Sequence, residues 1–531
     1  MTQEKICMLI AMGVYMAAVL VIGIICAKRN KTADDFYLGG RKLNPLVTAM
    51  SAEASDMSSW LLMGLPGLAY LTGISDAGWT AIGLAVGTYI NWLVVAKRLR
   101  RYTVVANNSI TLPDFFSNRF HDKRRILMCA SAIVILIFFV PYTASGFAAC
   151  GKLFSSLFGV PYMTAMVVSA VVIVAYTAIG GFLAASTTDL MQGILMSCAL
   201  VVVLIFGVVT AGGVGAVMDN AKEIPGYLSM FDSYSLKTGV STPYGGLNIL
   251  SMMAWGLGYF GMPHVLLRFM AIRKESQLKT SRRIASVWVV ISLFVAVVIG
   301  IVGASALPEL VDRSALIGAS DEALKQATST SETIFIAIAN VLGKSGVLPA
   351  LVAGVILAGI LAATMSTADS QLLAASSSVS QNFFKGIIHK KASDKTTMWV
   401  ARGTVIVIAV IGAVIASNPN SSIFEIVSFA WAGFGATFGP VVLFSLFWKR
   451  TTLAGALSGM LAGGIMVFVW KFLLKPLGGL WGIYELLPAF LVACLAILAV
   501  SLLTKAPGEE IGREFDLAAS KAPLEELEQE A

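Results

Sequence analysis

The chain consists of long apolar segments separated by short polar loops. Apolar runs of about 20 residues, the length that crosses a hydrocarbon core of about 30 Å as a helix, recur along it. They predict about thirteen membrane-spanning helices, at residues 6–27, 45–72, 77–97, 126–152, 161–180, 188–212, 247–268, 284–307, 333–368, 399–417, 424–447, 453–474 and 482–504. We therefore expect an all-α polytopic membrane protein, with a transmembrane domain over residues 1–504 and an acidic cytoplasmic tail over residues 505–531.

Two of these segments are interrupted. The second span carries Glu53 and Asp56 in its first half, and the seventh carries three glycines followed by Pro263. Each interrupted span opens a set of five, and an odd number of spans gives the two sets opposite orientations. This pattern predicts an inverted-repeat transporter with its site at the interruptions. The repeats are expected at about residues 45–212 and 247–447.

The basic residues indicate how the helices are oriented. If the N-terminus lies outside the cell, the Lys and Arg clusters all fall in cytoplasmic connections, and the opposite loops are poor in base. The clusters are Lys28–Lys31, Lys97–Arg101, Arg119–Arg125, Arg268–Arg283, Lys385–Arg402 and Lys449–Arg450. These loops account for the net charge of +8, so the charge is no indication of nucleic-acid binding. The C-terminus is expected in the cytoplasm.

Composition and motifs narrow the class of protein further. Charged residues make up 13% of the chain, against about 25% in a soluble domain. The six cysteines stand singly and predict neither a disulfide framework nor a zinc site. The sequence contains no HExxH, GxSxG or P-loop motif and no nucleophile–base pair. An enzyme is not expected.

Asp56 is the strongest single candidate for a functional residue. A carboxylate at bilayer depth costs several kcal/mol unless it faces a cavity or a cation, so such a residue marks a functional site by default. The alternative is a structural carboxylate neutralised by Arg41 or Lys42, which lie about four turns away along the chain. Glu53 is expected either nearer the cytoplasmic mouth or protonated.

A second polar block lies in the ninth span. The offsets 0, +3 and +4 place Ala363, Ser366 and Thr367 on one helical face. With the carbonyl groups freed by a break at Ala54–Met57, this face would form an all-oxygen cage suited to a hard monovalent cation. The alternative, which the spacing alone favours, is that both hydroxyls bond back to their own helix or to a neighbour.

Other polar and aromatic residues allow two interpretations each. Trp60, Tyr142, Trp255 and Tyr259 could line a small apolar pocket, although single aromatic residues more often pack in the core or at the membrane interface. Thr188 or Asp189 is expected to cap the helix beginning at Leu190, and a cytoplasmic cation exit site is the alternative.

These residues lie in segments that resemble the sodium:solute symporter family, and within it the bacterial branch that transports proline. The segments are Leu38-Gly-Gly-Arg41, Ala54-Ser-Asp-Met-Ser58, Trp60-Leu-Leu-Met-Gly-Leu-Pro-Gly67, Trp255-Gly-Leu-Gly-Tyr-Phe-Gly261 with Pro263-His264, Met365-Ser-Thr367, and Trp431-Ala-Gly-Phe-Gly435 with Phe438-Gly-Pro440. The resemblance implies the leucine-transporter-like fold, with spans 2–11 as a 5+5 inverted repeat and spans 1, 12 and 13 at the periphery.

The resemblance also implies roles for individual residues. It implies sodium ligands at Ala54, Met57, Ala363, Ser366 and Thr367, with Asp56 close to the ion. It implies a substrate pocket lined or gated by Ser58, Trp60, Tyr142, Trp255, Tyr259 and Pro263. Glu53 departs from the family pattern, which has a small residue there. Thr187 replaces a tryptophan, which weakens any role for Asp189.

The function expected from this resemblance is secondary active transport, in which inward sodium flow drives uptake of L-proline across a bacterial plasma membrane. The expected partners are sodium, L-proline or a similar small solute, and the lipid bilayer. Sodium is the coupling ion and no cofactor is expected; the oligomeric state stays open. Two alternatives remain within transport: a proton carried by Asp56 or Glu53, or another substrate such as an amino acid, betaine, pantothenate or a sugar. A transporter-like solute sensor is a third, although the tail after Leu503 is short for a signalling domain.

Overall fold

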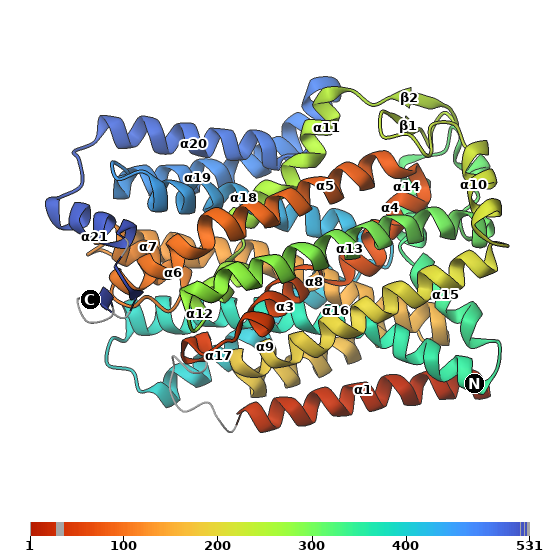
Figure 1. Cartoon of the computed structure of the whole chain (residues 1–531), viewed down its shortest axis with the longest axis horizontal. Helices are drawn as coiled ribbons and strands as arrows, with labels where there is room; N and C mark the ends of the chain where they lie inside the picture. Colours follow the sequence, from red (N-terminus) through yellow and green to blue (C-terminus); the bar gives the residue numbers. More distant parts are fainter. Residues whose placement is uncertain (1, 28–36, 521, 525, 528–531) are drawn as a thin grey trace.

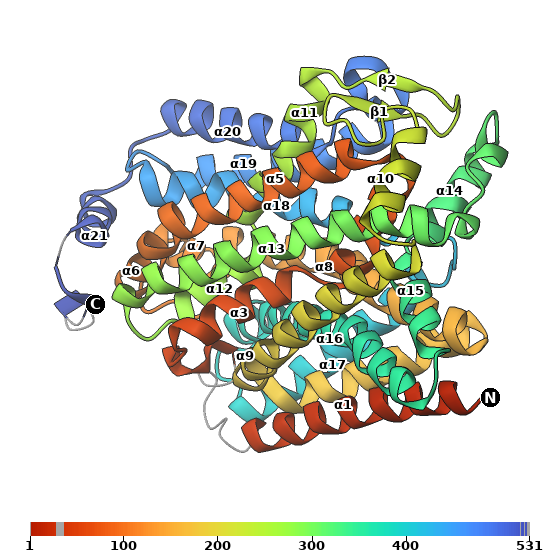
Figure 2. The same ribbon diagram turned by 45° about the vertical axis from the view of Figure 1, so that its right-hand side comes forward.

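The computed structural model describes residues 2–27, 37–520, 522–524 and 526–527. They form a bundle of long helices whose axes run roughly side by side, with the N-terminus and the C-terminus at opposite ends (Figure 1). Helix α1 forms one edge of the bundle and α19 and α20 form the opposite edge, in agreement with the peripheral positions expected for spans 1, 12 and 13 (Figures 1 and 2).

The first half of the chain supplies the helices up to residue 210. They are α1 (Gln3–Ala27), α3 (Pro45–Asp56), the π-helical turn η2 (Trp60–Gly64), α4 (Leu65–Thr72), α5 (Ile74–Ile90), η3 (Asn91–Val95), α6 (Ala96–Val105), α7 (Leu112–Arg119), α8 (Ile126–Phe158) and α9 (Tyr162–Thr210), with a short turn η1 (Gly39–Arg41) before α3.

The second half supplies the remaining long helices. They are α11 (Gly246–Met253), the 3-10 segment η4 (Ala254–Phe260), α12 (Pro263–Ala271), α13 (Leu278–Ala306), α15 (Ile334–Gly343), α16 (Val347–Ser377) with its π-helical extension η8 (Ser378–Ile388), α17 (Asp394–Ile415), α18 (Ile423–Phe447), α19 (Leu453–Val469) with η9 (Trp470–Leu474), and α20 (Leu486–Leu503).

Short elements cover the two ends of the bundle. At the end far from the C-terminus lie α10 (Val214–Glu223), α14 (Asp321–Ser331) and a hairpin of β1 (Asp232–Tyr234) and β2 (Ser241–Pro243), in which Ser233 pairs with Thr242 (Figure 2). The same region includes η6 (Pro308–Leu310) and η7 (Ser314–Leu316), and η5 (Glu275–Gln277) precedes α13. The loop between α19 and α20 contains η10 (Lys475–Leu477) and η11 (Gly479–Gly482), and α21 (Glu509–Ala519) lies in the tail.

The observed helices agree with most of the predicted spans, and the largest difference in boundaries is at the ninth span. Ten of the described helices are long and apolar enough to cross a membrane. The predicted span 333–368 is instead two helices, α15 and α16, separated at Gly346, whose φ of +133° favours glycine. The chain then stays helical to Ile388, well beyond the predicted end. The polar run after Ser366 hid this continuation, because its side chains are buried against protein and not exposed to lipid.

The prediction that Thr188 or Asp189 caps a helix is wrong, as helix α9 shows. Both residues lie inside the helix, and the Thr188 hydroxyl donates to the carbonyl oxygens of Ala184 and Ala185, at 3.0 Å each. The Tyr176 hydroxyl nevertheless lies 2.8 Å from that of Thr188. Twelve residues of straight helix would separate their Cα atoms by about 18 Å, more than the two side chains can bridge. The helix therefore bends sharply between them, and its two arms are the two predicted spans.

Glycines let the second interrupted helix pack against α5 without side chains between the backbones. A Cβ atom on Gly87 would lie 2.4 Å from the Cα atom of Gly256, and one on Gly256 would lie 2.2 Å from the carbonyl oxygen of Gly83. Neither position accommodates a larger residue without movement of the backbone. This contact fixes η4, the 3-10 part of the seventh span, against the third span.

At the end of the bundle where the C-terminus lies, arginine side chains bind carbonyl oxygens in the last turns of neighbouring helices. The guanidinium groups of Arg98 and Arg119 donate to the carbonyl oxygens of Leu446 and Ser445, in the last turn of α18, at 3.0 and 3.1 Å. Arg41 donates to the carbonyl oxygen of Met270 in α12, at 2.9 Å. The predicted cytoplasmic cluster Lys28–Lys31 lies outside the described residues.

The acidic tail is more ordered than its composition suggests. Its helix α21 packs against α6, where the Arg98 guanidinium lies 4.8 Å from the centre of the Phe515 ring. Arg101 donates to the carbonyl oxygen of Ala518, at 3.3 Å, and Lys449 pairs with Asp516, at 2.5 Å. The tail therefore forms a docked helix at this end of the bundle.

Candidate functional site

The centre of the bundle contains the end of α3. Asn44 caps the start of this helix, because its side-chain oxygen accepts the Val47 N–H at 2.9 Å, and Pro45 occupies the first helical position. The helix ends at Asp56, and Met57 (φ −79°, ψ 41°) leaves the helical path. The chain resumes helical geometry at Trp60, whose N–H donates to the Ser58 hydroxyl oxygen at 3.2 Å. The predicted break is present.

The break brings together residues from two distant spans. The Ser366 hydroxyl lies 2.7 Å from the carbonyl oxygen of Ala54 and 3.1 Å from that of Ala363, and it can donate to either. Three of the residues predicted as sodium ligands therefore converge on one point between α3 and α16. Met57 follows on the same turn of backbone, and its N–H is held by the carbonyl oxygen of Glu53, at 2.8 Å.

Thr367 distinguishes between the two interpretations of this polar face. Its hydroxyl is buried and has no hydrogen-bond partner among the residues that the structure describes. Threonines in helices commonly donate to the carbonyl four residues earlier, as Thr404 does to Val400 at 2.8 Å. Thr367 makes no such bond, and a buried unpaired hydroxyl is unfavourable. The hydroxyl of Thr367 therefore does not bond back to its own helix, and its oxygen is available as a cation ligand.

Asp56 is buried directly beside this face. One carboxylate oxygen accepts the Tyr259 hydroxyl at 2.6 Å, and the other has no hydrogen-bond partner in the described part of the chain. The Tyr142 hydroxyl donates to the Asp56 backbone carbonyl at 3.1 Å. Arg41, one of the residues considered as a neutralising partner, binds backbone carbonyls of Met270 and Ser109 instead. The charge of Asp56 is therefore not balanced by Arg41.

Aromatic rings pack against the other side of the break. The ring centres of Trp60 and Trp255 are 5.6 Å apart, and Trp255 also stacks on Tyr484 at 5.1 Å. Trp431 donates its indole N–H to the Trp255 carbonyl oxygen at 2.7 Å and meets the Tyr259 ring edge-on at 5.0 Å. The Trp60 indole N–H has no acceptor among the described residues.

Two members of this aromatic cluster could not be identified from the sequence. Phe424, at the start of α18, lies 5.2 Å from Trp255, and Tyr484 comes from the loop before α20. Neither stands in a segment that signals a site. Pro263 begins α12 as predicted, and the ring of its neighbour His264 lies 6.5 Å from that of Tyr142. The structure thus packs Trp60 on Trp255 and links Tyr259 to Trp255 through Trp431. His264, which follows Pro263 in the chain, lies near Tyr142.

Glu53 lies one turn before Asp56 and is also buried. It is 1% exposed, so it does not sit at an open mouth. The Trp92 indole donates to one carboxylate oxygen at 2.9 Å, and the second oxygen has no partner among the described atoms. Two carboxyl groups with an unpaired oxygen each therefore lie on one helix near the break.

A buried charge network lies between the break and the end of the bundle where the C-terminus lies. Arg268, expected in a cytoplasmic loop, is 1% exposed and pairs with Asp189 at 3.1 Å. Ser51 joins the pair, accepting from Arg268 at 2.9 Å and donating to Asp189 at 2.6 Å. Arg268 also donates to the Ser370 hydroxyl at 2.6 Å, next to Asp369. Asp189 is thus an ion-pair partner and does not cap a helix.

A second buried ion pair lies on the opposite side of the candidate site. The Lys152 ammonium group pairs with Glu332 at 2.7 Å, and both are almost fully buried. Glu332 also accepts the backbone N–H groups of Ile423 and Phe424, at 3.0 Å each, at the start of α18. Since Asp56, Trp60 and Trp255 are at most 5% exposed, the site is closed to solvent on both sides in this structure.

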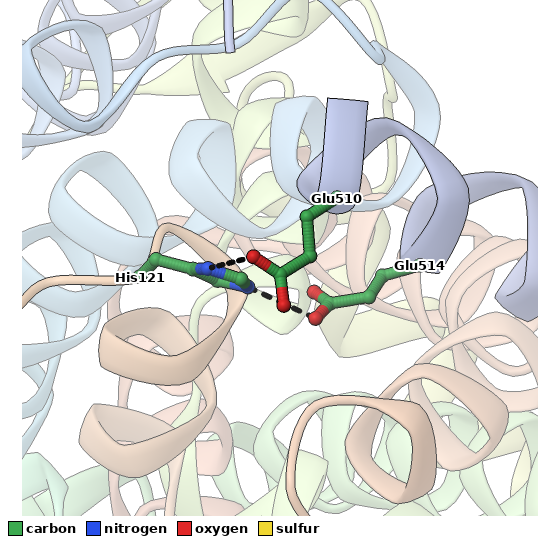
Figure 3. Close-up of side chains that lie close together, drawn as sticks. All are labelled: His121, Glu510 and Glu514. Atoms are coloured by element: carbon green, nitrogen blue, oxygen red, sulfur yellow. Dashed lines mark hydrogen bonds and ion pairs between the residues drawn. The ribbon is translucent and has the colours of Figure 1, made fainter. Parts of the chain in front are cut away.

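One further cluster of potential metal ligands lies far from this site. Figure 3 shows the His121 ring facing the carboxylates of Glu510 and Glu514 of α21; one ring nitrogen lies 2.9 Å from Glu514 and the other 3.7 Å from Glu510. A histidine ring binds one metal ion through one nitrogen, whereas here each nitrogen faces its own carboxylate. The geometry is that of a polar side-chain contact between α21 and the loop before α8.

Comparison with known proteins identifies the family. A model of the sodium:solute symporter family matches residues 36–463. The chain belongs to the sodium:solute symporter family. Members that it resembles include a protein of Escherichia coli (strain K12) named sodium/proline symporter, 43% identical over 508 residues that cover 96% of this chain and 95% of the relative. Proteins with the same name from Haemophilus influenzae (strain ATCC 51907 / DSM 11121 / KW20 / Rd) and Staphylococcus aureus (strain USA300) are 44% and 42% identical, over 96% and 94% of this chain and 97% and 93% of the relatives.

Solved structures confirm the fold expected for this symporter family. The structure titled as a substrate-bound, outward-open state of a Na+-coupled sialic acid symporter matches with a TM-score of 0.75 and 17% identity, over 94% of this chain and 99% of that one. Mhp1, a nucleobase-cation-symport-1 family transporter, matches with a TM-score of 0.52 and 14% identity, over 92% and 99%. The fold is leucine-transporter-like, as predicted.

Proposed function

We propose that this protein is a secondary active transporter in which sodium moving into the cell drives the uptake of L-proline. The observation that carries the proposal is the unpaired, buried Thr367 hydroxyl beside the contact between Ser366 and Ala54. The names of the relatives, which share 42–44% of their residues with this chain over nearly its full length, support proline as the substrate.

The sodium site would use neutral oxygen atoms. The carbonyl oxygens of Ala54 and Ala363, the hydroxyls of Ser366 and Thr367 and the backbone at Met57 offer such a set, and hard cations prefer oxygen ligands. Asp56 stands next to this set with one unpaired oxygen. A sodium ion would offset the buried negative charge, and the charge would offset the desolvation of the ion.

The proline site would lie on the aromatic side of the break. Proline has an apolar ring and a charged carboxylate and amine, so it needs an apolar wall and a few polar anchors. Trp255 and Tyr259 would enclose the ring, and the buried N–H of Trp60 with the backbone near Ser58 would bind the carboxylate. Tyr142 and Pro263 would border the pocket. Because proline and sodium would share the broken end of α3, binding of one would stabilise the geometry that the other needs.

The orientation that we propose places the N-terminus outside and the C-terminus in the cytoplasm of a bacterial plasma membrane. The arginines at Arg98, Arg101 and Arg119 lie at the end of the bundle that carries α21, and basic residues concentrate on the cytoplasmic side of membrane proteins. In this orientation the Arg268–Asp189 pair lies on the inner side of the site and the Lys152–Glu332 pair on the outer side. Transport would require each pair to separate in turn.

Proton coupling is the second candidate, because Glu53 and Asp56 each retain an unpaired carboxylate oxygen in the buried centre. One experiment separates the two. Purified protein in liposomes is given labelled L-proline with an inward sodium gradient, or with an inward proton gradient in sodium-free buffer. We expect accumulation with sodium alone. Accumulation driven by the proton gradient without sodium would overturn sodium coupling, and failure to transport proline under either gradient would overturn the substrate.

A further inference from the structure

The lipid-facing surface carries a groove that runs along the first half of α13. The groove holds a cavity of about 550 Å³ between α13, α9 and α3, and its lining is almost entirely apolar. Val201, Val287 and Ile291 on its walls are 45–60% exposed, so the groove opens toward the surrounding hydrocarbon. The Trp288 indole N–H crosses its floor and donates to the Ser197 hydroxyl at 2.7 Å, which leaves this donor satisfied.

The length of the groove corresponds to one leaflet of a bilayer. Its lining on α13 extends from Arg283 to Val295. Twelve residues of helix cover about 18 Å, close to half of a hydrocarbon core of about 30 Å plus the start of the headgroup region. An acyl chain that enters at Arg283 would therefore end near the middle of the membrane.

The end of the groove is positively charged. Arg283 lines it and is exposed, and it forms no ion pair with the described residues. Arg282, its neighbour in the sequence, does not line the groove and lies instead against the Tyr89 ring of α5, at 5.3 Å from the ring centre. Glu275, the acidic residue that precedes α13, is paired with Arg101 at 3.0 Å and does not neutralise Arg283.

We propose that this groove is a binding site for one anionic phospholipid, with an acyl chain along α13 and the phosphate group at Arg283; the proposal rests on the orientation given above, which puts Arg283 on the cytoplasmic side. Basic pockets between membrane helices on the cytoplasmic side bind anionic headgroups, and each Lys or Arg near the surface adds about 1 kcal/mol, or about fivefold in affinity. Met50 lines the same groove and stands one turn before Ala54 on α3. The lipid therefore packs against the helix whose end forms the central site.

A second groove on the same helix provides an internal comparison; we call it the outer groove, and the groove at Arg283 the inner groove. It holds about 340 Å³ between α5 and the later part of α13, is lined by apolar residues that include Ile82, Phe294 and Val298, and has no charged side chain in its lining. A lipid in this outer groove should be retained through its chain alone, without selection for the headgroup.

The test uses the full-length protein in phosphatidylcholine vesicles that contain a trace of phospholipid with a photoreactive group on its acyl chain. The headgroup of this trace lipid is either phosphatidylglycerol or phosphatidylcholine, and labelled residues are mapped by mass spectrometry. We expect phosphatidylglycerol to label the inner groove about fivefold more than phosphatidylcholine, and both to label the outer groove equally.

Two variants probe the inner groove and two serve as controls. Arg283→Gln should abolish the preference for phosphatidylglycerol, and Val201→Trp should block labelling by filling the groove. Arg402→Gln removes a lipid-facing arginine that does not line the groove, and Ile82→Trp fills the outer groove; neither should change inner-groove labelling. Equal labelling of the inner groove by the two lipids, or an unchanged preference in Arg283→Gln, would overturn the proposal. Because the readout is lipid labelling, the result does not depend on the transported solute.

Discussion

The Ser366 hydroxyl lies 2.7 Å from the carbonyl oxygen of Ala54, which stands 312 residues earlier in the chain. This contact joins the polar face of α16 to the carbonyl group left free where α3 ends. It connects the second span to the ninth, so any movement between these two helices changes the oxygen atoms around the proposed ion.

The first prediction concerns Thr367. If its hydroxyl binds sodium, Thr367→Ala should raise the sodium concentration for half-maximal proline uptake by about tenfold or more, since bonds to charged groups are worth about 1.5–3 kcal/mol. Thr367→Ser keeps the hydroxyl and should behave much more like the parent. Thr404→Ala is the matched control, because that hydroxyl bonds to its own helix. A normal sodium response in Thr367→Ala would remove this residue from the ion site.

The second prediction concerns the charge of Asp56. Asp56→Asn keeps the shape of the side chain but removes the charge that would offset the desolvation of sodium, so sodium-dependent proline binding should collapse. Asp56→Glu should retain part of it at higher sodium. Binding is measured on purified protein that has passed a thermal-unfolding check. Tyr259→Phe removes only the hydroxyl that donates to Asp56 and should have a smaller effect. Wild-type sodium dependence in the Asn variant would make Asp56 a structural residue.

The third prediction separates the solute pocket from the ion site. Trp255→Ala and Tyr259→Ala should weaken proline binding while sodium binding is largely kept, because their rings would form the apolar wall. Loss of a large buried ring also costs about 3–5 kcal/mol of stability. Trp470→Ala provides the control for tryptophan loss outside the centre, since Trp470 packs on Trp481 beyond the bundle core. Unchanged proline affinity in both central variants would place the pocket elsewhere.

The fourth prediction concerns the Arg268–Asp189 pair. Removal of one partner from a buried pair costs about 3–5 kcal/mol, because the other charge stays unpaired. Arg268→Gln should lower the melting temperature more than Asp189→Asn, since it leaves both Asp189 and its neighbour Asp369 without the cation. The double variant should be less destabilised than the sum of the two. Additive effects in this cycle would show that the pair contributes no coupling energy.

The fifth prediction is a dependence of stability on pH at Asp114 in α7. Loss of hydration raises the pKa of this carboxyl to about 6, although hydrogen bonds from Thr111 and Asn382 and the charge of Arg125 oppose the shift. A raised pKa in the folded state stabilises the fold at low pH, and this contribution is lost as pH rises through about 6. Asp114→Asn should therefore gain melting temperature relative to the parent between pH 5 and pH 8. A constant difference across this range would contradict the shift.

Hydropathy predicted the helices well, because a backbone inside a bilayer must form all its hydrogen bonds internally and a helix does so within one segment. The same principle explains the failures. The segment after Ser366 is polar because it lies inside protein, so its composition concealed a helix that continues to Ile388. Thr188 lies inside α9 and donates to the carbonyl oxygens of the preceding turn, so it does not act as the expected cap.

Some residues of the candidate site were recognised from the sequence and others were not. Ser366 and Asp56 stood out because polar groups are rare in spans, and the structure places both at the break in α3. Phe424 and Tyr484 could not be recognised, since an aromatic residue in an apolar segment has no pattern that reveals its neighbours. Arg268 was assigned to a loop because a charge near a span end usually reaches water, and only its contacts with Ser51 and Asp189 explain its burial.

The arginines at the helix ends have a consequence for how this protein can be altered. In the orientation proposed above, Arg98 and Arg119 belong to the cytoplasmic positive charge that directs membrane insertion, and in the folded protein the same side chains bind the last turn of α18. Replacement by lysine preserves the first property and loses the planar group that makes the second. The same arginines would thus act first in membrane insertion and later in the stability of the folded helix ends. Substitution by lysine would separate these two contributions.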